Sequence, residues 1–173
     1  MRRSTPSRPR CAFTLVEMIV VITMLGIAAS MIIPSMSSAG TLRVQGTLRS
    51  IVSDIGVAQS DAIAFQARRA VVFNYTTDAS RYVVAEINGG VVDTATGIIY
   101  DRHFGGENFG FSTVTATNLT DSTLYLDEMG GPIDGPTSDN PAGTGYVEIT
   151  GSNQTFRINI EAYTGRVTVQ RMP

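Results

Sequence analysis

Hydrophobic residues are distributed in three different ways along this chain of 173 residues. Residues 13–33, FTLVEMIVVITMLGIAASMII, form a nearly continuous apolar run with one charged side chain, Glu17. Between Val44 and Phe65 the apolar residues recur at spacings of three and four, which predicts a helix with one apolar face. From Ala70 onward short runs alternate between apolar and polar residues, as is typical of β-strands. The pattern predicts a long helix followed by a β-rich region.

The apolar run 13–33 is long enough to cross a membrane as a helix. At 1.5 Å per residue it measures roughly 31 Å, close to the hydrocarbon thickness of a bilayer. The leader that precedes it, residues 1–12, contains four arginines and no acid, and such a cationic flank stays cytoplasmic. We therefore expect a single pass through a membrane, with contacts to its lipid and with the rest of the chain on the side away from the cytoplasm.

The stretch 34–69 is predicted to be the amphipathic half of the same helix. Pro34 removes a helical hydrogen bond at a cost of about 3 kcal/mol, so we expect a kink or local unwinding there. Asp54 and the other polar residues fall largely away from the apolar stripe. We interpret this stripe as a core face rather than a partner site; it consists of Val44, Leu48, Ile51, Ile55, Ala58, Ala62 and Phe65.

Residues 70–173 are predicted to form a β-rich globular head. The segment 129–145 is rich in Gly, Pro and Asp, so we expect a long surface loop there. Short strands that follow one helix favour an α+β domain with an antiparallel sheet. The expected strands are residues 70–75, 81–87, 98–104, 109–117, 123–126, 146–150, 155–161 and 166–170.

Charge and cysteine content limit the possible functions. All 13 basic residues are arginines, and without the leader 9 of them remain against 15 acids, a formal charge of −6. This acidic balance argues against general nucleic-acid binding. The only cysteine, Cys11, lies in the leader, so the rest of the chain has no thiol for a disulfide or a metal site.

The residues at the start of the apolar run form a recognisable motif. The hexapeptide AFTLVE, Ala12 to Glu17, resembles the prepilin peptidase site of type IV pilins and type II secretion pseudopilins. The resemblance implies cleavage by a prepilin peptidase between Ala12 and Phe13 and N-methylation of Phe13. The family normally has Gly where this chain has Ala12. An ordinary signal peptide, cut around residues 35–40, is the alternative, but it leaves the motif unexplained.

Glu17 has a distinct expected role. A charge within a membrane-spanning run costs at least ~2.5 kcal/mol, which indicates a partner or a function. Since the resemblance implies a positive amine on Phe13 after cleavage, Glu17 of one subunit is expected to neutralise the Phe13 amine of a neighbour. The resemblance thus implies assembly with other pseudopilins or pilins through the N-terminal helix.

Three shorter patches resemble minor pseudopilins of the H type (GspH/FimT-like): QSDAI at 59–63, LD at 126–127 with GGP at 130–132, and TGRV at 164–167. The resemblance implies a pilin-like fold and a subunit of a type II secretion pseudopilus. It also implies that the chain is held in the inner membrane with its head on the periplasmic side. A minor pilin of a type IV pilus is the alternative, including a role in DNA uptake. Some relatives bind DNA through closely spaced arginines after this glycine, but here Arg166 is followed by Thr168 at the paired position.

Other candidate chemistry is weaker, and we expect neither enzymatic activity nor a cofactor. His103 is the only histidine, and we interpret it as a structural residue at a strand end. Asp134, Asp139 and Asn140 lie in the predicted loop but lack the regular oxygen spacing of a calcium site, so no metal is expected.

Overall fold

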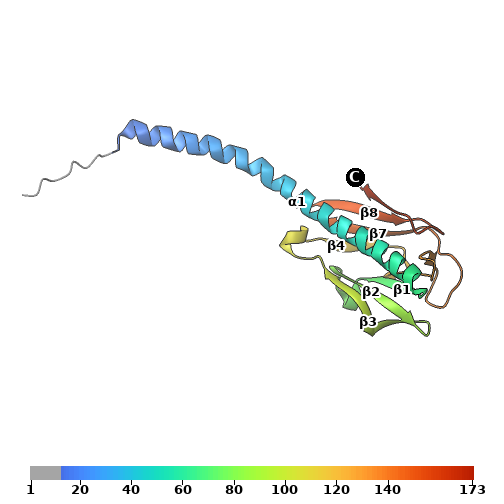
Figure 1. The fold of residues 1–173 in the computed structure, drawn as a ribbon. Coiled ribbons are helices and arrows are strands. Elements are labelled where there is room, and N and C mark those ends of the chain that lie inside the picture. Colours follow the sequence, from blue (N-terminus) through green and yellow to red (C-terminus); the bar gives the residue numbers. More distant parts are fainter. Residues whose placement is uncertain (1–12) are drawn as a thin grey trace, which may run out of the picture. The chain divides into compact units, whose positions relative to one another are not determined.

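The computed structural model describes residues 13–173, except for the side chains of residues 31–39. Cys11, Ala12 and the rest of the predicted leader lie outside the described residues. The chain divides into two compact units, Met1–Ser38 and Ala39–Pro173, which are considered separately below. Within residues 13–173 there is one long helix, α1 (Leu15–Phe65), followed by antiparallel strands (Figure 1). The predicted α+β fold is confirmed.

The beginning of α1 is fixed by a side-chain cap. Thr14 directly precedes the helix, and its hydroxyl oxygen accepts a hydrogen bond from the amide of Glu17 at 3.2 Å. A threonine cap with Glu at the third helical position is the sequence of a capping box, and an acid in the first turn also complements the helix dipole. Glu17 therefore has a local role in starting the helix.

The helical backbone of α1 continues through Pro34. The kink predicted there falls on a residue whose side chain lies outside the described part, so it stays a prediction. The predicted membrane span, 13–33, also ends among these residues. In the part of the chain that the structure describes, no helix combines the length and the apolar character needed to cross a membrane.

The strands of the Ala39–Pro173 unit form two antiparallel sheets. The first has the order β3-β2-β1-β5-β6, with strands β1 (Arg69–Phe73), β2 (Arg81–Asn88), β3 (Val91–His103), β5 (Thr123–Leu126) and β6 (Pro132–Ile133). The second has the order β4-β7-β8-β9, with strands β4 (Thr113–Thr117), β7 (Gly145–Gly151), β8 (Gln154–Ile160) and β9 (Val167–Arg171). Short 3₁₀ turns occur at Tyr75–Thr77, Glu107–Phe109 and Thr120–Ser122.

One hydrophobic core joins α1 to both sheets, whose strands lie beside the C-terminal half of the helix in Figure 1. The predicted stripe of α1 is buried from Val44 to Ala62, as expected for a core face. The prediction is wrong for the last member of the stripe, Phe65. This residue is 70% exposed because α1 ends there, and its ring lies under the guanidinium of Arg69. The sheets contribute Val71, Phe73, Tyr82, Val84, Leu124, Leu126, Val114, Val147, Ile149, Phe156, Ile158 and Ile160.

Most predicted strands are present, with three differences. β3 begins at Val91 rather than at residue 98, and β4 begins only at Thr113. The late start of β4 has a backbone cause, because Gly110 and Phe111 adopt left-handed φ values of 67° and 51°. The predicted loop 129–145 contains β6, which pairs with β5 and buries Ile133.

Candidate functional site

The N-terminal part of α1 exposes apolar side chains on all its faces. Its large apolar residues between positions 13 and 27 are all exposed: Phe13, Leu15, Val16, Met18, Ile19, Val20, Val21, Ile22, Met24, Leu25 and Ile27. Glu17 is exposed among them, and within residues 13–173 it makes no ion pair. Such a surface can bury itself only against lipid or against other apolar helices.

The predicted cleavage site lies just outside this helix. Phe13 and Thr14 precede the first helical residue, Leu15, and Phe13 is exposed. The cap at Thr14 sets the point where helical hydrogen bonding begins, so Phe13 is not part of the helix. Ala12 itself lies outside the described residues, and cleavage stays a prediction.

The other half of α1 has a buried acid that the sequence pattern misplaces. Asp54 is expected to point away from the apolar stripe, yet its side chain is only 8% exposed. Its Oδ2 accepts hydrogen bonds from the Tyr82 hydroxyl at 2.7 Å and from Arg102 Nε at 2.9 Å. Burial, and then the bond to Asp54, raise the pKa of Tyr82. Asp54 can be buried because these partners satisfy it, and it ties α1 to β2 and β3.

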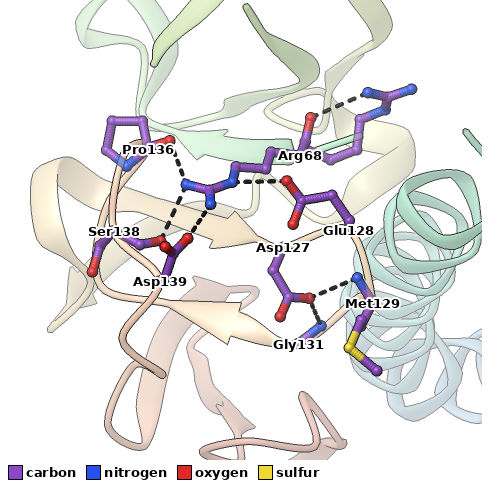
Figure 2. A network of polar contacts seen from close by, with 9 residues as sticks. Arg68, Asp127, Glu128, Met129, Gly131, Pro136, Ser138 and Asp139 are labelled. Carbon is purple, nitrogen blue, oxygen red and sulfur yellow. Dashed lines mark hydrogen bonds and ion pairs between the residues drawn. The ribbon is translucent and has the colours of Figure 1, made fainter. Parts of the chain in front are cut away.

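The three patches that resemble minor pseudopilins meet at one place, which we call the Gln59 junction: Gln59, Asp127, Gly130, Gly131 and Gly165. Nε2 of Gln59 donates to the carbonyl oxygens of Gly130 at 3.3 Å and Gly165 at 3.0 Å. Oδ1 of Asp127 accepts the amide of Gly131 at 2.7 Å, as Figure 2 shows. A helix and two turns are thereby joined through polar contacts.

Two glycines of the Gln59 junction are required by its geometry. Gly130 and Gly165 have φ values of 78° and 61°, which L-residues with a side chain rarely adopt. A Cβ on Gly165 would also collide with Nε2 of Gln59. The patches are therefore explained by packing: they determine how two turns dock on α1.

A second polar network fixes the long segment after β5 (Figure 2). The guanidinium of Arg68 donates to Glu128 Oε1, to the Pro136 carbonyl and to the Ser138 carbonyl, each at 3.1 Å, and forms an ion pair with Asp139. The bonds to Glu128 and then to Asp139 raise the pKa of Arg68. The pKa of Glu128 is lowered, first by its own backbone amide and then by Arg68. An internal cation thus holds this segment in place.

The calcium candidates take part in these structural contacts. The carboxylate of Asp139 pairs with Arg68, and the amide of Asp134 donates to the Asn140 carbonyl at 3.1 Å. Among the described residues there is no group of three or more His, Cys, Asp or Glu side chains that could hold a metal ion. No signal in the sequence connects Arg68 with this segment, because the two are about 70 residues apart.

His103 lies at the end of β3 beside Asp78, with Nδ1 3.6 Å from Asp78 Oδ2. Ser80 donates its hydroxyl to the other oxygen of Asp78 at 2.7 Å, and this bond lowers the Asp78 pKa. The serine is thus bonded to the acid, whereas a catalytic triad needs it bonded to the histidine. Arg166 is exposed before β9 and pairs with Glu161 at 2.5 Å, as expected of a solvated arginine at a turn.

Known proteins share two of the features described above, the N-terminal motif and the fold. Residues 7–33 match the family model described as the prokaryotic N-terminal methylation motif. No curated protein matches the sequence. Two crystal forms of the type IV minor pilin FimU of Pseudomonas aeruginosa (strain PAO1) are similar in fold, with TM-scores of 0.52 and 0.50 at 13% and 12% identity. They cover 75% of this chain, and 88% and 92% of the FimU chains.

Proposed function

We propose that this chain, which combines a pilin-like fold with an N-terminal methylation motif, is a minor pseudopilin of a type II secretion system. A prepilin peptidase cleaves it between Ala12 and Phe13 and methylates Phe13. The mature subunit is then stored in the inner membrane and assembles into a pseudopilus. The observation that carries this proposal is the surface between Phe13 and Ile27, where apolar side chains are exposed on all sides of the helix and Glu17 is the only charged residue.

The exposed apolar surface explains why such a subunit needs two environments. Each apolar Å² left in water costs about 25 cal/mol, so a fully exposed apolar helix is unfavourable. Lipid covers it before assembly, and the equivalent helices of neighbouring subunits cover it in the filament. In the filament Glu17 pairs with the Phe13 amine of the next subunit, because an unpaired charge among packed apolar helices is strongly penalised.

Removal of the leader is what permits the change of environment. Residues 1–12 carry four arginines, and each charge taken into the bilayer centre costs about 2.5–3.5 kcal/mol. The uncleaved chain is therefore held at the cytoplasmic face. Cleavage leaves one amine, whose charge Glu17 can neutralise, so that the helix can leave the membrane as part of a bundle.

A minor pilin of a type IV pilus is the second candidate, and the fold likeness to FimU favours it. DNA uptake receives no support from the head, because Arg166 pairs with Glu161 and the paired arginine is replaced by Thr168. Deleting the chain in its host distinguishes the two machines. Loss of a secreted substrate indicates the secretion system, and loss of surface filaments or twitching indicates the pilus.

Substitutions at Glu17 test the assembly role. Glu17→Ala removes both the charge and the acid of the capping box, whereas Glu17→Gln removes the charge but keeps a side chain that capping boxes accept. We expect both variants to be processed and both to lose association with partner subunits, by about 3 kcal/mol at each contact. Processing is followed by intact mass, and association by co-purification from membranes.

The same experiment can contradict the proposal in two ways. Retained association in Glu17→Gln with loss in Glu17→Ala would mean that Glu17 acts only as a helix cap. A mature chain that starts near residue 39 rather than at Phe13 would indicate an ordinary signal peptide, and the assembly role of α1 would then be wrong.

A further inference from the structure

An open groove of about 480 Å³ lies between α1 and the last strand of the second sheet. Four apolar side chains line it: Leu48 and Val52 from α1, Phe156 from β8 and Val169 from β9. Val169 lies opposite the buried Ile158 in the register of β8 and β9, so it is on the core side of the sheet. It is nevertheless 45% exposed, because the groove beside it is open to solvent.

The backbone of β9 adds an open hydrogen-bonding edge to this groove. β9 is the last strand in the order β4-β7-β8-β9, and it pairs only with β8 within the described residues. Bonds from Glu161 N to Arg166 O and from Met172 N to Thr155 O bracket the ladder. Antiparallel alternation then directs the backbone groups of Val167, Val169 and Arg171 away from β8. An edge of this kind can accept another strand.

Arginines that form no ion pair lie in or near this groove. Seven of the nine arginines in residues 13–173 form ion pairs. The two that form none within this range are Arg49 and Arg171. Arg49 lines the groove. Arg171 follows Val169 by two positions in β9, so the side chains of Val169 and Arg171 lie on the same side of the strand. A chain with excess acid thus presents one arginine without an ion pair in the groove lining and a second two positions along β9 from the lining residue Val169.

We propose that this groove binds an extended, acidic segment of a partner protein, which adds as a strand to the edge of β9. The backbone of the segment pairs with Val167, Val169 and Arg171. One of its apolar side chains enters the groove against Val52 and Val169, and its carboxylates pair with Arg49 and Arg171. This inference goes beyond the assembly role proposed for the N-terminal part of α1. Because the groove lies within Ala39–Pro173, peptide binding and assembly can be tested separately, and either proposal can fail while the other holds.

The apolar floor and the strand edge favour a peptide over other anionic partners. Single-stranded nucleic acid is bound mainly by stacking of bases on exposed aromatic rings. The groove has one aromatic ring, Phe156, and that ring is buried. Peptide binding by strand addition uses backbone bonds for affinity and pockets for alternate side chains, and β9 with its groove offers both.

The test uses the full chain in mild detergent and a fluorescent peptide, Thr-Glu-Thr-Val-Thr-Glu-Thr. In an extended conformation its valine and two glutamates share one face. Fluorescence anisotropy is compared with a peptide that has lysine in place of glutamate and with one whose alternate amides are N-methylated, which cannot complete the ladder. We expect the acidic peptide to bind at least about tenfold more tightly than either control, and to slow amide exchange at Val169 and Arg171.

Variants of the chain identify the site. The double variant Arg49→Glu with Arg171→Glu is expected to weaken binding about tenfold, a change of about 1.4 kcal/mol. Arg166→Glu is the matched control, since Arg166 is also exposed but precedes β9 and lies outside the strand edge with which the peptide would pair. We expect it to bind as the unmodified chain does. The melting temperature of each variant shows that the head remains folded.

Several results would overturn the proposal: equal binding of the acidic and lysine peptides, full binding by the N-methylated peptide, unchanged affinity in the double variant, or no binding of the acidic peptide. Tighter binding of a single-stranded oligonucleotide that displaces the peptide would assign the groove to nucleic acid. Self-association of the chain that the double variant abolishes would assign it to a second copy, and either result would replace the proposed partner.

Discussion

The two ends of helix α1 have the same secondary structure but opposite surroundings. Between Phe13 and Ile27 every large apolar side chain is exposed, whereas between Val44 and Ala62 a single stripe is fully buried. The sequence differs accordingly, because the first stretch is apolar on all faces and the second has polar residues between its stripe positions. The second stretch finds its core within its own chain. The first stretch finds none among the described residues of its own chain.

The acids of the two stretches differ in the same way. Asp54 is buried and accepts hydrogen bonds from Tyr82 and Arg102 of its own chain. Glu17 is exposed and has no ion-pair partner in the described part of the chain. A buried, paired acid contributes to the stability of one subunit, whereas an unpaired acid on an apolar helix is available to a neighbour. The comparison predicts that substitutions in one stretch affect folding and those in the other affect association.

The largest expected effect comes from the buried stripe. Ile51→Ala removes a fully buried side chain and should destabilise the head by about 3 kcal/mol, through lost burial and a cavity. Ile22→Ala is the matched change in the exposed stretch and should alter head stability by less than about 0.5 kcal/mol. Thermal unfolding of the full chain in detergent measures both. Equal destabilisation by the two variants would contradict the division of the helix.

Asp54→Ala is expected to cost somewhat less, about 2 kcal/mol. It leaves the buried Tyr82 hydroxyl without its acceptor, but Arg102 is half exposed and can turn to water, which reduces the loss. Asp134→Ala, at an exposed acid, serves as control and should be nearly neutral. The prediction would be wrong if Asp54→Ala unfolds at the same temperature as this control.

Arg68→Met tests whether an internal cation holds the segment after β5. The change removes bonds to two carbonyls and two carboxylates, at an expected cost of about 1.5 kcal/mol, and should expose residues 134–140 to proteolysis. Arg166→Met, which breaks one exposed pair, should leave the stability nearly unchanged. Limited proteolysis with fragment mass analysis reports on the segment. Similar cleavage in both variants would assign the order of the loop to other contacts.

The smallest effect concerns pH. The pKa values of Glu128 and Asp101 are lowered in the folded chain from ordinary values of 4.5 and 3.8, for Asp101 chiefly by its bond to Arg81. A lowered pKa contributes stability above the ordinary value, and that stability is lost as the pH falls through the folded pKa. The melting temperature should therefore be constant from about pH 7 to 5 and decline below about pH 4.5.

Solvent exposure of both carboxylates keeps this loss to about 1 kcal/mol or less. In Arg68→Met the decline should be shallower, because one of the causes that lower the Glu128 pKa is gone. Thermal unfolding at a series of pH values measures both slopes. A loss of stability between pH 7 and 5 would mean that another group controls the acid response.

The parts of the fold that could be predicted are those with a regular spacing of apolar residues in the sequence. Residues 123–126 are predicted as a strand and form β5 with the same bounds, because four consecutive strand-forming residues stand between turn residues. The stripe is predicted up to Ala62 because helical spacing needs no knowledge of the partner. Prediction fails at Phe65, where the helix ends, and at β6, whose two residues are too few to show a period.

Long-range contacts explain the rest. The burial of Asp54 depends on Arg102, 48 residues away, and the division of the strands into two sheets depends on which distant strands pair. In the candidate site, the capping box from Thr14 to Glu17 is readable from four letters. The cut before Phe13, its methylation and the pairing of Glu17 stay predictions, because they are events between molecules.

The Gln59 junction has a consequence for biosynthesis. Its bond to Gly165 joins residues 106 positions apart. The helix leaves the ribosome early, but one of the two acceptors of Gln59 is translated 106 residues later. A chain whose synthesis stops before Gly165 therefore lacks this closing contact and also lacks β9, which follows it. Proteases that degrade incomplete chains can recognise the turn and the sheet edge that such a chain leaves open.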